Sequence, residues 1–187
     1  MNAVEPKKFS SREELAAVLK KERDLAGADI SGLDLSGMKL TALNLKGADL
    51  HDVNLSKALV AGADISEVNL ANANLTNARI YGADLHHANL QGANLQGIKI
   101  AGADLKEANL AGADLGQSRL TGIDVSAADF TDVKTTGARA IGVDWSEAKV
   151  PPAELPAAIQ PPRWLPFLAV GIVVALIGVL VMRRRAR

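Results

Sequence analysis

Apolar residues recur at every fifth position along most of the chain, from Leu25 to Phe130, without a skipped position. Alanine often stands two positions before each of these central residues, and Asp or Asn usually stands directly before it. An α-helix has a period of about 3.6 residues and a half-buried strand a period of about two, so neither is predicted. A five-residue period predicts a chain that turns a corner every five residues, with one large and one small side chain pointing inward on each side. The central residues are Leu25, Ile30, Leu35, Leu40, Leu45, Leu50, Leu55, Val60, Ile65, Leu70, Leu75, Ile80, Leu85, Leu90, Leu95, Ile100, Leu105, Leu110, Leu115, Leu120, Val125 and Phe130.

A second period of 20 residues overlies the first. Basic residues precede the central position at intervals that are multiples of 20, with Leu59 at the one intervening place. They are Lys39, Arg79, Lys99, Arg119 and Arg139. Twenty residues hold four units, so we expect four units per coil. Residues 20 apart then stack at about 4.8 Å, as in a parallel sheet.

The repeated unit reads A-(D/N)-L-x-x, as in Ala83-Asp84-Leu85-His86-His87. Over about residues 25–150 the chain resembles the pentapeptide-repeat family. The resemblance implies an all-β fold, a right-handed quadrilateral parallel β-helix in which stacked coils share one core. A leucine-rich repeat can also have a period near 20, but it spaces its leucines unevenly, which excludes it here.

Both ends of such a solenoid need caps, because an open end exposes core and unpaired backbone. Residues 1–24 form an N-terminal segment in which Ser11 and Glu14 have the spacing of a capping box. We expect a short helix from there to about Lys21, whose apolar residues cover the first coil. At the other end, Trp145 occupies a central position, and we expect a relaxed last coil that closes the solenoid.

The C-terminal part divides into a proline-rich linker at 151–163, a transmembrane helix at 164–182 and a basic tail at 183–187. Leu165 to Met182 carries no charge over 18 residues, which is long enough to span a bilayer. Trp164 stands at one edge, where interfacial aromatics are found. A buried helix of the solenoid domain is the alternative, and the flanking prolines and arginines argue against it.

Two observations conflict over membrane topology. The arginines after the span favour a cytoplasmic C-terminus, which would place the solenoid outside. The N-terminal segment has no apolar run that could serve as a signal peptide, and this favours a tail-anchored protein with a cytoplasmic solenoid. We expect the second arrangement; a mis-assigned start codon would reverse it. Gly171, Ala175 and Gly178 lie near one face of the span, where small residues permit a homodimer. Ordinary membrane-helix composition is the slightly favoured explanation of these small residues.

Candidate chemistry is sparse. The chain has no cysteine, which excludes disulfides and thiolate sites. His86 and His87 occupy successive outward positions that diverge, whereas metal ligands must converge, so we expect no metal site and no cofactor. The Asp/Asn column recurs in almost every unit, which marks it as structural, since these side chains hydrogen-bond the backbone at corners. The sequence therefore predicts no enzyme.

Charge is unevenly distributed along the chain. Net charge is zero overall, but residues 25–150 carry a net charge of −5. The basic column lies beside an acidic column, so their fields should largely cancel, and no aromatics interleave for base stacking. We therefore expect no nucleic-acid partner. The expected structural explanation is a solvated face whose opposite charges pair with each other.

One side of the solenoid departs most from neutrality and is the predicted docking side for an unidentified protein. Its outward positions carry Asp64, Asp84, Asp104, Asp124 and Asp144, with Glu67, His87, Glu107 and Glu147 three positions further on. The sequence thus predicts a non-catalytic, membrane-anchored scaffold. The family resemblance implies an alternative, because some members imitate duplex DNA and bind DNA gyrase, which confers fluoroquinolone resistance.

Overall fold

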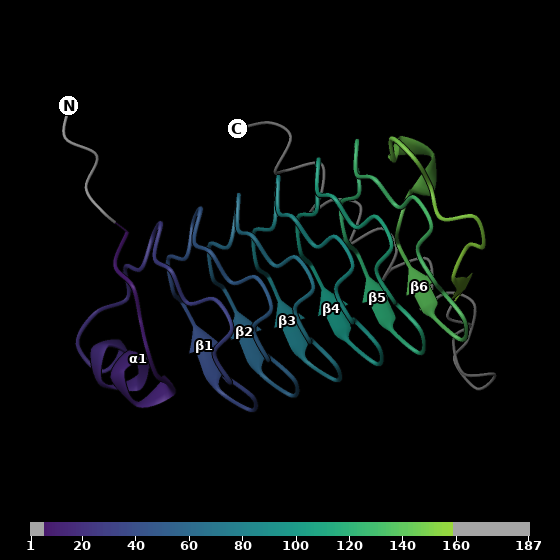
Figure 1. Ribbon diagram of the computed structural model, residues 1–187. Helices are drawn as coiled ribbons and strands as arrows, with labels where there is room; N and C mark the ends of the chain where they lie inside the picture. The colour runs from purple at the N-terminus through teal and green to yellow at the C-terminus, as the bar shows by residue number, and fades with distance from the viewer. Residues whose placement is uncertain (1–5, 159–187) are drawn as a thin grey trace, which may run out of the picture.

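The computed structural model describes residues 6–158, and its main feature is a single parallel sheet running along one side of a solenoid (Figure 1). Each coil contributes one short strand. The strands are β1 (Lys39–Thr41), β2 (Leu59–Ala61), β3 (Arg79–Tyr81), β4 (Lys99–Ala101), β5 (Arg119–Thr121), β6 (Arg139–Ile141) and β7 (Ala157–Ala158). From β1 to β6, every residue pairs with the residue 20 positions later, so one coil is 20 residues long.

The other three sides of the coil stack with the same offset. Isolated parallel bridges join Asp24 to Asn44, Asp29 to Asp49 and Asp34 to Asn54, and they continue in three columns up the solenoid. Together with the strands they make four columns, which confirms four units per coil. We call the side of β1–β6 the strand side. The next side along the chain, centred on Leu45, Ile65, Leu85, Leu105 and Val125, is the aspartate side, and the one after it, centred on Leu50, Leu70, Leu90 and Leu110, is the opposite side.

The interior is filled by the two inward positions of each unit. Central residues such as Leu85 and Leu105 are 1% exposed, and the alanines two positions before them are 3% exposed. One continuous cluster of these side chains extends from Phe9 to Ala140. Since each coil covers the apolar edge of its neighbours, the core is shared by all coils, as the periodicity predicts.

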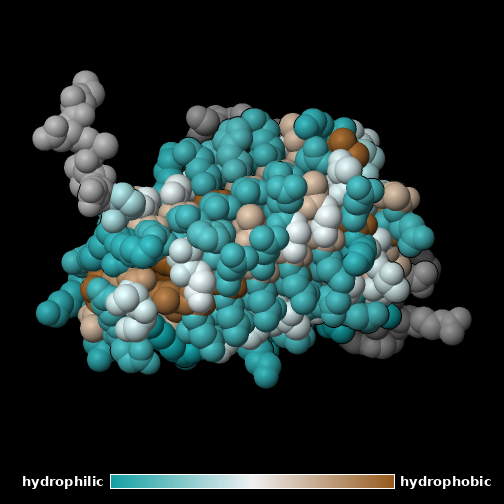
Figure 2. Space-filling model, in the orientation of Figure 1, coloured by the Kyte–Doolittle hydropathy of each residue, from teal (hydrophilic) through white to brown (hydrophobic). Residues whose placement is uncertain are grey.

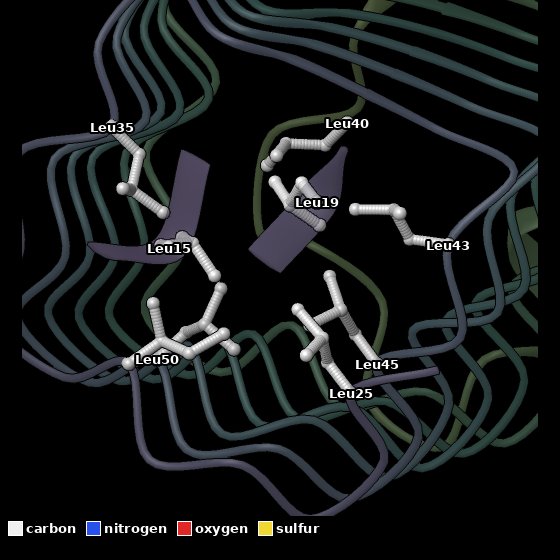
Figure 3. Close-up of a pocket in the computed structure, with 9 residues that line it drawn as sticks. Leu15, Leu19, Leu25, Leu35, Leu40, Leu43, Leu45 and Leu50 are labelled. Atoms are coloured by element: carbon white, nitrogen blue, oxygen red, sulfur yellow. The ribbon is translucent and has the colours of Figure 1, made fainter. Parts of the chain in front are cut away.

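The N-terminal end is closed by helix α1 (Arg12–Leu19). Ser11 caps it by accepting a hydrogen bond from the Glu14 amide at 3.1 Å, while the Glu14 carboxylate accepts from the backbone of Ser10 rather than Ser11. Leu15 and Leu19 point from the helix into the mouth of the first coils (Figure 3). They leave an apolar cavity of only about 10 Å³, too small and too apolar to favour a water.

A segment before the helix also joins the solenoid, which the sequence pattern does not show. The Phe9 amide donates to the Asp29 carbonyl at 2.9 Å, and the Asp29 amide donates to the Lys7 carbonyl at 2.9 Å. Phe9 itself is buried. Residues 7–9 therefore pair with the exposed edge of the first coil and help to cap it.

The C-terminal end is closed by a distorted coil. Trp145 begins a short 3₁₀ turn, η1 (Trp145–Glu147), and its ring meets that of Phe130 edge to face at 5.3 Å. The Phe130 amide donates to Val150 at 2.8 Å, and β7 then adds to β6 with an offset of 18 rather than 20 residues. Pro152 and Pro156 are buried in this coil. The solenoid thus extends to residue 158, into the segment predicted to be a linker.

Within residues 6–158, no helix is long and apolar enough to cross a membrane. The predicted span at 164–182, the basic tail at 183–187 and the small residues Gly171, Ala175 and Gly178 lie outside the described residues, as does the rest of the linker. On the face shown in Figure 2, polar residues cover most of the surface.

Candidate interaction surfaces

The aspartates of the aspartate side are part of its turns. In each unit, Oδ1 accepts a hydrogen bond from the amide two residues later, for example Asp64 from Ser66 at 3.0 Å and Asp104 from Lys106 at 2.8 Å. This local bond holds the backbone at the corner. The interpretation of the Asp/Asn column as structural is therefore confirmed, and the carboxylates have fixed orientations.

Several of these carboxylates accept a second hydrogen bond from the side chain that follows. Ser66 Oγ donates to Asp64 at 2.6 Å, and His86 Nδ1 lies 2.9 Å from Asp84 Oδ1. The hydrogen bond from Ser66 Oγ is the main reason that the pKa of Asp64 lies below its usual range, with burial opposing it. Asp64 consequently remains ionised at neutral pH.

The outer file of the aspartate side, made of Glu67, His87, Glu107 and Glu147, lies where the sequence predicts. Glu67, His87 and Glu107 stand at corners with φ near +57°. Part of the charge in this file is balanced within the side: Glu67 pairs with Lys46 at 3.1 Å, and Glu107 lies 3.6 Å from Lys106 and 3.4 Å from His87 Nδ1. Glu147 accepts from Ser126 Oγ at 2.6 Å.

Asparagines hold the opposite side together. Asn69 donates to Asp49 at 2.9 Å, and Asn89 donates in turn to Asn69 at 3.1 Å. Such amide bonds run from coil to coil while the same side chains close the local turns. These residues are therefore accounted for by the fold. On the aspartate side, by contrast, the hydrogen bonds to Asp64, Asp84, Asp104 and Asp124 within residues 6–158 all come from their own turns.

The strand side carries the basic row, which we define as Lys39, Arg79, Lys99, Arg119 and Arg139. The basic residues and Leu59 occupy the place that Asp or Asn takes in most units of the other sides, and on this side the backbone forms extended strands. All five basic residues are exposed. Within residues 6–158, no ion pair joins them to the aspartate side. The expected pairing between the two columns is therefore wrong, because each aspartate is oriented by its own turn.

The side chains of His51 and His86 contact the aspartate two residues earlier in the chain. His51 Nδ1 lies 2.9 Å from Asp49 Oδ1, and this hydrogen bond raises the pKa of His51. The rings of His86 and His87 are tilted, with centroids 5.0 Å apart. In the part of the chain that the structure describes, no three His, Asp or Glu side chains are placed to hold a metal ion.

The comparisons with known proteins agree with this architecture. Eight copies of the family model Pentapeptide repeats match residues 24–56, 61–97, 88–126 and 108–144, more than half of the chain. No curated protein matches the sequence. Among solved structures, the chain is similar to the pentapeptide repeat protein Rfr23 from the cyanobacterium Cyanothece 51142, with 23% identity and a TM-score of 0.50 over 70% of this chain and 96% of Rfr23.

It is also similar to a trypsin-treated variant of QnrB1, a plasmid-mediated fluoroquinolone resistance protein. The identity is 16% and the TM-score 0.56, over 92% of this chain and 93% of that one. At these sequence identities, the similarity to either structure shows a shared fold and nothing about function. Periodicity, four-sided coil and family model lead to one conclusion: this chain belongs to the pentapeptide-repeat family.

Proposed function

We propose that this protein is a non-catalytic scaffold, held at a membrane by Leu165–Met182, that presents the aspartate side to a basic protein partner. Pentapeptide-repeat proteins are generally structural or binding proteins. The observation that carries the proposal is the column of aspartates stacked in register, Asp64 with Asp84 and Asp84 with Asp104.

Folding alone does not account for this column. Like charges on directly opposed residues of neighbouring strands destabilise a sheet. On the opposite side, asparagine closes the same turn and adds a bond to the next coil, so Asn would serve the fold at least as well as Asp. A basic partner gives the aspartates a role, because an acidic stripe speeds encounter and fixes register.

The docking side is tested by charge reversal in the full chain. Glu67, Glu107 and Glu147 are changed together to Lys, and partners are captured from native membranes at low salt. We expect capture to fall several-fold while the circular dichroism spectrum is unchanged. The matched control reverses three acids on other sides, Asp52, Asp132 and Glu154; equal loss in both variants, or in neither, would refute the docking side.

Two of the control positions have a backbone conformation that lysine already adopts elsewhere in the chain, and the third, Glu154, is exposed. Asp52 and Asp132 stand at corners with φ of 58° and 55°, and Lys57 already occupies such a corner at 59°. Both reversals change the net charge equally, so a difference between them reports position rather than total charge.

The membrane tether has a separate test. The full chain should float with lipid vesicles and resist extraction by alkaline carbonate, whereas a chain ending at Ala158 should not. For topology, we propose a cytoplasmic solenoid: protease added to intact cells should leave it uncut. Cleavage within residues 151–163 under those conditions would place it on the other side.

DNA-gyrase binding is the second candidate. It is supported by the likeness of fold to QnrB1 over most of both chains. A DNA mimic requires a strongly negative rod, and the basic row interrupts the negative surface here. Inhibition of gyrase supercoiling by the chain ending at Ala158 would favour this candidate over the scaffold.

A further inference from the structure

The basic row has no explanation in the fold or in the proposed docking side. Register places Arg79 beside Lys99, Lys99 beside Arg119, and Arg119 beside Arg139 on consecutive parallel strands. Directly opposed like charges repel. Because no carboxylate within residues 6–158 pairs with them, this repulsion is not relieved inside the molecule. The row therefore fits an anionic surface outside it.

Beside the basic row, the strand side carries mostly small side chains, and we call this strip, from the far end of each strand to the next corner, the ledge. The outward residues at the far end of each strand are small or uncharged, and none is acidic: Thr41, Ala61, Tyr81, Ala101, Thr121 and Ile141. Glycines form the next corner, and a Cβ added at Gly62, Gly82 or Gly102 would meet nothing within 4 Å. The strands lie side by side along one edge of the solenoid (Figure 1), so this ledge is long and open.

Tyr81 stands in the middle of the ledge and is 39% exposed, between Ala61 and Ala101 on the neighbouring strands. A tyrosine with an apolar ring and a polar end is favoured at the interface between lipid and water. Small neighbours leave the ring accessible. A flat cationic surface with one interfacial aromatic matches a bilayer surface.

The end of the described chain is attached to this same side. Ala157 and Ala158 of β7 pair with Arg139 and Ala140 of β6. Six residues lie between Ala158 and Leu165, where the uncharged stretch of the predicted span begins, and these seven Cα–Cα steps reach no more than about 25 Å. If Leu165–Met182 spans the membrane, the last coil on the strand side is held close to the headgroups.

We infer that the strand side lies against the membrane, with the basic row on anionic lipid headgroups. This inference rests on the tether proposed above. A hollow of about 350 Å³ at the C-terminal end of the row is lined by Arg119 and Arg139 with Gln117 and Ala157. It is where a headgroup phosphate can meet two guanidinium groups, which bind phosphate through paired hydrogen bonds.

A nucleic acid offers the same phosphate chemistry and is the competing ligand. Single-stranded nucleic acids are bound by stacking bases on successive aromatic side chains. Tyr81 is the one aromatic among the outward residues of β1–β6. Together with the short connection to the predicted span, this favours lipid.

The experiment uses the full chain in vesicles and exploits its lack of cysteine. A single fluorescent label is placed at Ala101→Cys on the strand side or at Ala111→Cys on the opposite side, two alanines of similar partial exposure. Quenching is measured with a quencher attached to the lipid headgroup. Vesicles contain phosphatidylcholine alone or mixed with phosphatidylglycerol, and flotation is recorded for every sample.

We expect quenching at Ala101→Cys to be several-fold stronger than at Ala111→Cys in the phosphatidylglycerol vesicles. The contrast should shrink in phosphatidylcholine and at about 1 M salt, where the Debye length falls to about 3 Å. It should also shrink in a variant with Arg79→Gln, Lys99→Gln and Arg119→Gln. It should persist in the control with Lys46→Gln, Lys106→Gln and Lys149→Gln, which removes equal charge from other sides.

The remaining outcomes test the membrane-facing side and the tether separately or together. Flotation with both lipids but equal quenching at the two labels overturns the membrane-facing side and leaves the tether intact. Flotation with phosphatidylglycerol alone, with the contrast present, supports the surface and overturns the tether. Absence of flotation overturns both. Binding of a fluorescent single-stranded oligonucleotide that depends on the same three cations, without a quenching contrast, replaces lipid by nucleic acid.

Discussion

At the scale of single residues, the Asp or Asn before each central position decides the path of the backbone. Its Oδ1 atom accepts a hydrogen bond from the amide two residues later on three of the four sides, as at Asp34, Asp64 and Asn69. An ionised carboxylate and a neutral amide both provide this acceptor. They differ in their response to pH.

Acid should therefore destabilise the solenoid through its turn aspartates. The hydrogen bond from Ser31 Oγ, aided by Lys8, lowers the pKa of Asp29 well below its ordinary range, and the Thr131 hydroxyl lowers the pKa of Asp129 in the same way. A lowered pKa in the folded state means that the unfolded state binds more protons. The stability that these aspartates contribute is fully present above the ordinary carboxyl pKa and is lost as pH falls through their lowered pKa values in the folded state.

We expect the free energy of unfolding to decline below about pH 5. Asp29→Asn should flatten this decline, because Asn69 shows that an amide fits the equivalent turn. Urea unfolding at a series of pH values measures the slope. An unchanged slope in the variant would show that Asp29 does not contribute to acid sensitivity.

Substitutions at inward and outward positions should differ sharply. Leu90 is 2% exposed in an apolar lumen, so Leu90→Lys buries a charge without a partner and should cost about 4 kcal/mol or more. His87, at the preceding corner, has a side chain that is 47% exposed, and Lys57 occupies a like corner, so His87→Lys should be nearly neutral. Thermal unfolding compares them; equal losses would contradict the assignment of inside and outside.

One inward position carries a polar group at a cost. Ser118 is fully buried, and its hydroxyl makes no hydrogen bond within the described chain. Ala78 and Ala138 fill the equivalent positions in other coils. Ser118→Ala should therefore stabilise the protein by about 1 kcal/mol, and Ala138→Ser should destabilise it by a similar amount. If Ser118→Ala does not stabilise the protein and Ala138→Ser does not destabilise it, the Ser118 hydroxyl has a hydrogen-bond partner in solution.

At the scale of elements, two different structures meet in each coil. Turns closed by Asp or Asn form three sides, and strands form the side where a basic residue or Leu59 replaces them. The ends require elements of another kind. Helix α1 and residues 7–9 cover one end, and η1 with β7 covers the other.

The capping helix should contribute through one side chain above all. Leu15 is 1% exposed and packs over the first coils (Figure 3), so Leu15→Ala should cost about 3 kcal/mol. Glu13→Ala, on the exposed face of the same helix, should cost only a few tenths of a kcal/mol. The measurement is urea unfolding of both variants; a small loss for Leu15→Ala would show that the first coil is stable without its cover.

At the scale of the whole molecule, the repeat determines most of the structure from sequence. Even spacing predicts the lumen, and the 20-residue superperiod predicts four sides. The parts of the structure that the sequence does not predict lie where the repeat is absent. Residues 7–9 contain no repeat unit, and the prolines after Val150 resemble a spacer, although Pro152 and Pro156 are buried in the last coil. Charge pairing was also mispredicted, since it depends on where each corner directs its side chain. The predicted docking side stays a prediction.

Truncation should locate the end of the folded unit. A chain ending at Ala148 loses the bond from the Phe130 amide to Val150, the bond from Thr135 Oγ1 to Glu154 and all of β7, whereas a chain ending at Ala158 keeps them. At about 1 kcal/mol per hydrogen bond and about 2–4 °C per kcal/mol, the shorter chain should melt several degrees lower. Equal melting temperatures would place the boundary before residue 149.

The constant offset of 20 residues limits how a gene of this kind can change length. Removal of residues 81–100 would join Ile80 to Ala101, and every later residue would still find a partner of its own column one coil away. Removal of five residues would instead turn all later coils by one side, carrying aspartates onto the strand side. Duplication or deletion of a whole coil therefore changes the length of the rod and preserves its charged faces. Deletion of a single five-residue unit moves the charged residues of every later coil to a different face.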